Sequence, residues 1–354
     1  MKKKLLMCLC MILATCVLMA GCGMAGDDAV KSSSSSVNDA NGGVKNSLAP
    51  LGSKENPFKL GVSPMSGWYA WYGVKGTGIF EKNGVNVEIK FFPVYSDSLT
   101  AFYSNQLDGI CIAASDAVAP TNSNINFKMV LVNDNSYGAD GLIVHEGINS
   151  VKELKGKTVA TELGTLEHMF LLKILEDNGM TINDVNFVNM TINDAGPAFI
   201  AGKVDAAVLW EPTLSMAMQG GGKLLYSTKQ TPGLIPDTLA IHNDIIASDP
   251  KLVQGIVNSW FDGVTMLQAN DPKFMKAIYD GAEISADDYA IMLDGVTIFD
   301  KAKNQATFKE GNNYTSLPYT LQKSAEFLKS VGMIDKIPDN LKSLLEDQFI
   351  KNAK

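Results

Sequence analysis

Residues 202–212 have the sequence Gly202-Lys203-Val204-Asp205-Ala206-Ala207-Val208-Leu209-Trp210-Glu211-Pro212, which joins an apolar segment to a polar, aromatic ending. The apolar part, from Asp205 to Leu209, is short and bounded by turn-forming residues, so it predicts a buried strand. The ending at Trp210 and Glu211 then falls at the carboxyl end of that strand, which is the edge where ligands bind in α/β sheets. The stretch therefore predicts an α/β fold with a ligand site at the sheet edge.

From residue 57 onwards, short apolar segments alternate with segments of helical periodicity. The expected strands are 58–62, 87–92, 109–113, 127–132, 158–161, 185–190 and 205–209. The expected helices are 71–83, 97–105, 165–178, 194–201, 252–269, 317–331 and 341–350. Such alternation is typical of right-handed βαβ units, so we expect mostly parallel sheets with helices on both faces.

A folded part of roughly 300 residues is large enough for two lobes. Two segments with similar endings, Leu142-Ile143-Val144-His145 and Leu239-Ala240-Ile241-His242, frame the second series of strands. We interpret them as paired strands that cross between the lobes. Residues 57–141 and 243–354 are then the first lobe and residues 142–242 the second.

The N-terminal segment carries a targeting pattern. Lysines at positions 2–4 precede an apolar segment at 5–19 that is too short for a comfortable transmembrane span, as in a secretory signal. We expect residues 1–21 to be a signal peptide. The small and polar residues 22–56 are expected to be a flexible tether, on the order of 30 Å long as a random coil.

Cys22 directly follows Met19-Ala20-Gly21, and together these residues resemble the lipobox of bacterial lipoproteins. The resemblance implies that Cys22 receives a diacylglyceryl group and anchors the protein on the extracytoplasmic face of the cell membrane. The alternative is an ordinary signal peptide that contains a cysteine by chance.

The composition is acidic and lacks arginine: 38 Asp and Glu stand against 30 basic residues, all lysine. The formal net charge of −8 argues against nucleic acid as a partner, because phosphate neutralisation requires a basic surface. Without arginine, a bound anion must rely on backbone amides, hydroxyls, indoles or a lysine. Cys111 is the one thiol expected in the mature chain, which excludes an intramolecular disulfide.

Motifs for chemistry are weak. Gly156-Lys157-Thr158 resembles the end of a phosphate loop but leads into a strand, whereas a phosphate loop opens a helix. The three histidines show no metal-ligand spacing, so we expect no metal and no cofactor. Neither Ser63 nor Ser115 lies in a Gly-x-Ser-x-Gly motif, and no catalytic residue is predicted.

Polar and aromatic residues instead follow most of the expected strands. Because the carboxyl ends of parallel strands share an edge, these residues are expected to line one cleft. The best anion site is Gly164-Thr165, where free amides at a helix start carry partial positive charge. A structural role remains open for several of them, since Ser115, Thr165 and Asp194 are good helix N-caps and Trp210 is of a type often buried.

Between residues 61 and 242 the chain resembles the solute-binding proteins of nitrate, sulfonate and taurine ABC importers, a group that includes binders of thiamine-precursor pyrimidines. The segments that carry the resemblance are 67–71, 78–88, 106–109, 115–116, 154–160, 164–165 and 202–212, the last being the most specific. The chain departs from the family pattern at Ala70, where proline is common, and in its lack of arginine. Both departures leave the ligand class open.

The resemblance implies a two-lobe periplasmic-binding-protein type II fold with hinge strands around Val144 and Ile241, which closes on a small solute and performs no chemistry on it. It implies an ABC permease and its ATPase as partners, and we expect a monomer. The implied ligand-binding residues are Ser66, Trp68, Tyr69, Ser115, Asp116, Gly164, Thr165, Asp194, Trp210 and Glu211.

For the ligand we expect a small organosulfonate or taurine-like anion. Its head would lie on the amides at Thr165, and tryptophans with Asp116 or Glu211 would contact the other end. An aminopyrimidine or thiamine precursor is the alternative ligand. An enzyme of the pyrimidine-synthase type, which uses histidine chemistry, and a surface lipoprotein that binds no solute are less favoured.

The lipid anchor gives a first prediction. Cys22→Ala removes the acylated thiol, so the variant should leave the membrane fraction in a high-salt wash that retains the unaltered protein. Immunoblots of the two fractions measure this, and a Cys22→Ala protein that stays membrane-bound contradicts the anchor.

Overall fold

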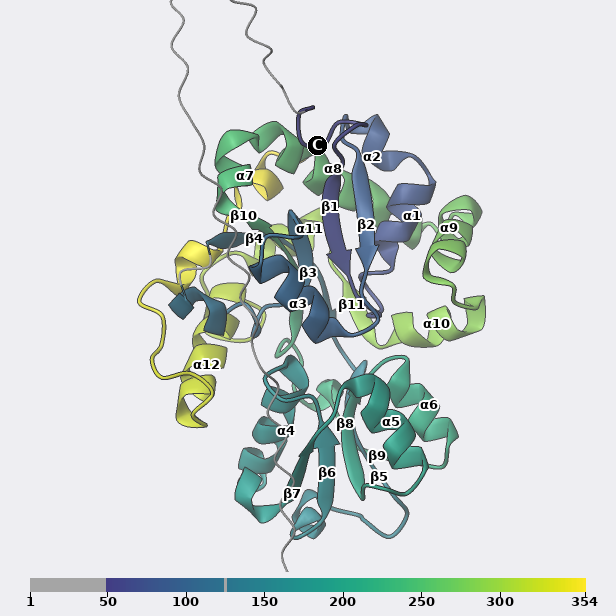
Figure 1. The fold of residues 1–354 in the computed structure, drawn as a ribbon, viewed down its shortest axis with the longest axis vertical. Helices are drawn as coiled ribbons and strands as arrows, with labels where there is room; N and C mark the ends of the chain where they lie inside the picture. The colour runs from purple at the N-terminus through teal and green to yellow at the C-terminus, as the bar shows by residue number, and fades with distance from the viewer. Residues whose placement is uncertain (1–48, 124–125) are drawn as a thin grey trace, which may run out of the picture. The chain divides into compact units, whose positions relative to one another are not determined.

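The computed structural model describes residues 49–123 and 126–354 (Figure 1). The expected signal peptide, Cys22 and most of the expected tether lie outside the described residues. Within the described part, no helix combines the length and the apolar composition that crossing a membrane requires.

The larger of two sheets contains six strands in the order β11-β4-β10-β3-β1-β2. They are β1 (Phe58–Val62), β2 (Val87–Phe91), β3 (Gly109–Ala113), β4 (Phe127–Ser136), β10 (Pro236–His242) and β11 (Val296–Ile298). β1 is parallel to β2 and to β3, whereas β10 is antiparallel to β3 and β4, and β11 is antiparallel to β4.

The smaller sheet contains five strands in the order β7-β6-β8-β5-β9. They are β5 (Asp140–Val144), β6 (Thr158–Thr161), β7 (Asn186–Asn189), β8 (Ala206–Trp210) and β9 (Lys223–Ser227). β6 is parallel to β7 and β8, and β5 is antiparallel to β8 and β9. Each sheet therefore has a parallel trio extended by antiparallel strands, so the sheets are mixed and not mostly parallel.

The predicted pairing of residues 142–145 with residues 239–242 is wrong. β5 pairs with β8 and β9 in the smaller sheet, and β10 pairs with β3 and β4 in the larger one. Both strands are buried along their whole length, because each has a neighbour on either side in its own sheet. The chain passes between the sheets at 137–139, after β4, and at 228–235, before β10.

The helices cover the sheets as the alternation predicts, with some boundaries moved. Those of the first half are α1 (Ala70–Gly76), α2 (Ile79–Lys82), α3 (Tyr95–Tyr103), α4 (Leu166–Asp177), α5 (Ile192–Ile200) and α6 (Thr213–Gln219). The C-terminal ones are α7 (Asn243–Ser248), α8 (Pro250–Gln268), α9 (Pro272–Ala282), α10 (Ala286–Asp294), α11 (Lys301–Thr307), α12 (Leu317–Ser330) and α13 (Gln348–Lys351). The single helix expected at 71–83 is two helices, because Gly78 between them has a φ of 72°.

Aromatic packing joins the helices on the larger sheet. The Trp71 ring of α1 is fully buried, with its centroid 5.7 Å from that of Phe80 on α2 and 4.9 Å from that of Trp260 on α8. Gly73 allows α9 to approach, since a Cβ at that position would lie 2.5 Å from the ring of Phe274. These contacts hold α1 and α2 against α8 and α9, and so fix the end of the loop that joins β1 to α1.

An aspartate before the third strand of each parallel trio ties that strand to its neighbour. The Asp108 carboxylate accepts a hydrogen bond of 2.7 Å from the Lys59 N–H, and the Asp108 N–H donates to the Lys59 carbonyl. Asp205 makes the same two bonds with Thr158, at 2.8 and 2.9 Å. Asp205, in the stretch 202–212, is thus a structural residue.

The folded part begins before the residue expected from composition. The carbonyl of Gly52 accepts hydrogen bonds from the backbone and side-chain N–H groups of Asn86, at 2.8 and 3.1 Å. Leu51 packs against the core. Residues 49–56, expected as the end of the tether, therefore lie on the larger sheet, because Asn86 satisfies a turn that the polar composition alone does not reveal.

Asp205→Ala should lower the free energy of unfolding by about 1–2 kcal/mol, because it removes a charged acceptor from the Thr158 N–H at the start of β6. Urea unfolding followed by circular dichroism measures the change. Asp280→Ala, which breaks an exposed pair with Lys276, is the control and should change stability by less than about 0.5 kcal/mol. Equal effects of the two substitutions would contradict the structural role.

Candidate functional site

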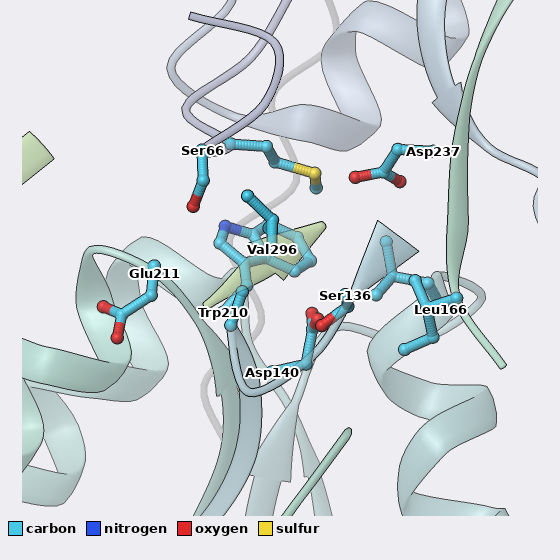
Figure 2. Close-up of a pocket in the computed structure, with 11 residues that line it drawn as sticks. Ser66, Ser136, Asp140, Leu166, Trp210, Glu211, Asp237 and Val296 are labelled. Carbon is cyan, nitrogen blue, oxygen red and sulfur yellow. The ribbon is translucent and has the colours of Figure 1, made fainter. Parts of the chain in front are cut away.

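A cavity lies where the carboxyl ends of the parallel strands of both sheets meet (Figure 2). Its walls come from both sheets and the segments between them: Met65, Ser66, Ser136, Ala139, Asp140, Leu166, Trp210, Glu211, Ile235, Asp237 and Val296. The free volume is about 20 Å³, which is room for about one water molecule. A solute larger than water can enter only if the two sheets move apart.

Ser66 and Trp210 lie on the wall of this cavity, as the sequence predicts. Ser66 is in the loop after β1, is 2% exposed, and its Oγ has no hydrogen-bond partner. The Trp210 ring at the end of β8 contacts Tyr95, the first residue of α3, edge to face, with centroids 5.8 Å apart. Trp210 thus bridges the two sheets and also closes the cavity.

Glu211 also lines the cavity, but its carboxylate is already engaged. It accepts hydrogen bonds from the N–H of Ser215 at 3.0 Å and from the Ser215 hydroxyl at 2.7 Å, both in the first turn of α6. Figure 2 shows the Glu211 side chain pointing away from Asp140. Burial raises the pKa of Glu211, and the two bonds to Ser215 oppose that rise.

Two buried aspartates lie side by side on adjacent strands of the larger sheet. Asp134 of β4 and Asp237 of β10 are direct cross-strand partners, so their Cβ atoms are about 5 Å apart. Asp134 is fully buried and neither of its carboxyl oxygens has a hydrogen-bond partner; Asp237 Oδ1 also lacks one. Gly67 leaves the space for Asp134, because a Cβ at position 67 would lie 1.9 Å from Asp134 Oδ2.

A bulge produces this arrangement. Asp237 lies opposite Asp134, but the next residue, Thr238, lies opposite Val132, so Asn133 is the extra residue of β4. The sequence analysis placed residues 133–136 beyond the end of a strand, whereas they are part of β4. The bulge turns the two aspartates to the end of the sheet where the cavity lies.

Three further carboxyl groups belong to this region, of which Asp140 lines the cavity. Asp140 begins β5 directly opposite Trp210 and lies against Glu167 of α4. Asp116 follows β3 and is half-buried, with Oδ2 unpartnered. Burial is the main cause of a raised pKa in all three, to about 6 for Asp140 and about 7 for Asp116.

These buried carboxyl groups form an acidic cluster, in which every ionised group is negative: Asp116, Asp134, Asp140, Glu167 and Asp237. Burial and then the neighbouring carboxylates Asp134 and Asp140 raise the pKa of Asp237 well above its usual range, and burial with Asp140 does the same for Asp134. In residues 49–123 and 126–354, no ion pair includes a carboxylate of the cluster. Burial and mutual repulsion therefore favour the neutral, protonated form of these carboxyl groups in the unliganded protein.

The helix start expected to bind an anion is already engaged. The Gly164 N–H donates to His168 Nδ1 at 3.4 Å, and the Thr165 hydroxyl donates to the Glu162 carbonyl at 2.8 Å. The N–H of Leu166 faces the Asp116 carboxyl and lowers its pKa. Gly164 itself is exposed, and neither it nor Thr165 lines the cavity. The positive end of α4 thus faces a carboxyl group of the protein.

Other predicted residues lie away from the cavity. Asp194 is exposed and accepts a 2.9 Å hydrogen bond from the hydroxyl of Thr191, so Thr191 and not Asp194 is the N-cap of α5. Trp68 and Tyr69 are buried in the aromatic core, against Tyr95 and Tyr289. Ser115 is buried and its hydroxyl donates to Asp116.

The sequence analysis missed Asp140 and Asp237. Both are single acids beside apolar strands, in Ala139-Asp140-Gly141 and Pro236-Asp237-Thr238, and resembled turn residues at strand boundaries. An acid at the start of a mostly apolar run, as in residues 140–144 and 237–241, was the available signal.

No group of three or more His, Cys, Asp or Glu residues in the described ranges is arranged to hold a metal ion. The histidine rings stack on phenylalanines, His145 on Phe199 and His242 on Phe102. Cys111 is fully buried in β3. The cavity wall contains no histidine or cysteine among the described residues.

Two mixed α/β sheets, joined by two crossing segments and enclosing a cavity at their carboxyl edges, define the periplasmic binding protein fold. The chain belongs to the NMT1/THI5-like family, whose model matches residues 70–274.

Relatives and a solved structure agree with this assignment. The "Putative aliphatic sulfonates-binding protein" of Bacillus subtilis (strain 168) is 27% identical over 358 residues, 100% of this chain and 97% of the relative. The "Taurine-binding periplasmic protein" of Escherichia coli (strain K12) is 21% identical over 282 residues, 77% of this chain and 86% of the relative. The crystal structure of the periplasmic aliphatic sulphonate binding protein SsuA from Escherichia coli has a TM-score of 0.69 at 19% identity, over 82% of this chain and 92% of that one.

The raised pKa values predict the pH dependence of stability. A carboxyl whose pKa is higher in the folded chain than in the unfolded chain, where it is about 4, binds more protons when folded, so stability falls as pH rises through the folded pKa. For Asp140 and Asp116 that window is pH 4 to about 7. The free energy of unfolding of the ligand-free protein should therefore rise as pH falls from 8 to 5, by on the order of 1–3 kcal/mol.

Asp140→Asn, which keeps the shape without the charge, should raise stability at pH 8 and flatten the profile, as measured by urea unfolding at several pH values. The exposed Asp194→Asn is the matched control and should leave the profile unchanged. A ligand-free protein that gains stability from pH 5 to pH 8 would show that the carboxyl groups are not buried as described.

Proposed function

We propose that this protein is the solute-binding subunit of an ABC importer and captures its solute in the cavity between two lobes, each built on one of the two sheets. The observation that carries the proposal is the cavity itself, which both sheets line at their carboxyl edges and which is too small for a solute unless the lobes separate. Binding would then follow a cycle of opening, capture and closure, as in other hinged binding proteins.

Contacts across the cleft support closure as a discrete state. The side-chain amide of Asn193 on α5 donates to the Pro93 carbonyl of the larger sheet at 3.0 Å. Trp210 contacts Tyr95, and the Ser96 side chain lies beside the Glu162 carboxyl group and lowers its pKa. These few contacts would break on opening, while the two crossing segments stay connected.

The crossing segments are the candidate hinge. Ser136 Oγ and Thr228 Oγ1 lie 2.7 Å apart, and the Gly138 N–H donates to Thr228 Oγ1 at 2.7 Å, so the two segments are bonded to each other. The hinge we propose is therefore at 137–139 and 228–235, several residues from Val144 and Ile241.

The names of the relatives support an organic sulfonate or taurine-like solute. Delivery to a permease and its ATPase, an anchor at Cys22 with residues 22–48 as its tether, and a monomeric state belong to the same proposal. The aminopyrimidine alternative remains compatible with Trp210 and the carboxyl groups. A cavity wall without histidine or cysteine gives no support to the enzyme alternative.

Trp210→Ala should weaken solute binding about tenfold or more, because it removes the aromatic wall and the inter-lobe contact with Tyr95. Calorimetry with a panel of sulfonates, amines and aminopyrimidines measures affinity, and small-angle scattering measures closure. The control, Ile200→Ala, truncates an exposed side chain on α5 and should bind normally. If no panel member or cell-extract solute binds or closes the wild-type protein, the proposed function is wrong.

A further inference from the structure

Buried carboxyl groups, several of them without hydrogen-bond partners, concentrate at the cavity. Asp237 and Ser66 lie on one side of it, Asp140 on the other, and the Trp210 ring between them (Figure 2). Asp237 is 6% exposed and Ser66 is 2% exposed, and each has an oxygen with no hydrogen-bond partner. Asp134, directly across the strand from Asp237, adds two more unpartnered oxygens. These carboxyl oxygens outnumber the uncharged donors on the cavity wall, the Ser66 hydroxyl and the Trp210 N–H.

Among the described residues, no cationic side chain is paired with these carboxyl groups. The chain has no arginine, and none of the ion pairs in the described ranges reaches the cluster. A lysine does lie on an adjoining cavity of about 350 Å³ that shares Ser136, but the Lys303 ammonium donates to the Ile298 carbonyl at 2.9 Å. Buried acids in this arrangement disfavour folding unless a ligand compensates them.

The adjoining space between the lobes is acidic as well. A cavity of about 240 Å³ between α6 and α10 shares Glu211 with the first and also exposes Glu283 and Asp288. A negative potential along this space attracts cations toward the site and repels anions. The helix start that could have offset it, at α4, faces Asp116.

We propose that the cleft selects a solute with a cationic nitrogen, an ammonium or amidinium group, which Asp237 and Asp140 hold against the Trp210 ring with Asp134 behind and Ser66 Oγ as a further acceptor. This rests on the proposed function and narrows it. An ammonium has three donors for these acceptors, and a ring face beside it adds cation–π attraction. A sulfonate is accepted when it carries an amine, with its anionic head outside the cluster, and is rejected without one.

The test uses three probes with the same two-carbon spacer against the full protein near neutral pH. They are taurine, isethionate, which has a hydroxyl in place of the ammonium, and ethanolamine, which has a hydroxyl in place of the sulfonate. Calorimetry should show binding of taurine and ethanolamine, with isethionate weaker than taurine by about tenfold or more. Asp237→Asn, which keeps the shape of the side chain, should remove most of the preference for taurine over isethionate. The control, Asp194→Asn, should retain it.

Isethionate that binds as tightly as taurine would overturn the inference, since protonated carboxyl groups would then be donating to the anion, yet the proposed function would stand. Absence of binding by both amines, in a protein that closes around another panel member without a cationic nitrogen, overturns it equally. Should Asp237→Asn fail to fold, Asp140→Asn with the same probes gives the same comparison.

Discussion

The pairing of Asp134 with Asp237 across β4 and β10 is the constraint on which the site depends. Like-charged residues directly opposite each other in a sheet disfavour folding, and burial increases the effect. The sheet tolerates them because both can hold protons, and because the large aromatic core around Trp71 and Trp260 stabilises the same lobe. The local loss of stability is confined to the edge where the lobes meet.

The aspartates of the two sheets fall into a structural group and a cavity-lining group. Asp108 and Asp205 bind backbone N–H groups at the starts of strands and hold the parallel trios together. Asp140 and Asp237, at the other end of the sheets, line the cavity. Aspartate is thus structural at the amino ends of the parallel strands, where its carboxylate accepts a hydrogen bond from a backbone N–H. At their carboxyl ends it lines the cavity and is available to a ligand.

Local pattern predicted much of the fold but little of its long-range pairing. The strands at 58–62, 109–113 and 158–161 have the predicted bounds, because each is an apolar run bounded by turn residues. The partners of β5 and β10 were mistaken, since pairing depends on segments far apart in the chain. At the site, Ser66, Trp210 and Glu211 were predicted and line the cavity, whereas Asp194 has the same local pattern and only its position in space removes it from the site.

The bond between Gly52 and Asn86 determines where the N-terminal segment leaves the fold. Asn86 precedes β2, so the attachment point is at the amino edge of the larger sheet, a full strand length from the cavity. If Cys22 is acylated as proposed, the anchored segment joins the folded part at the end of the larger sheet away from the cavity. A pull along the proposed tether would then act on the strand ends near Gly52 and Asn86. It would not act directly on the segments at 137–139 and 228–235 that we propose as the hinge.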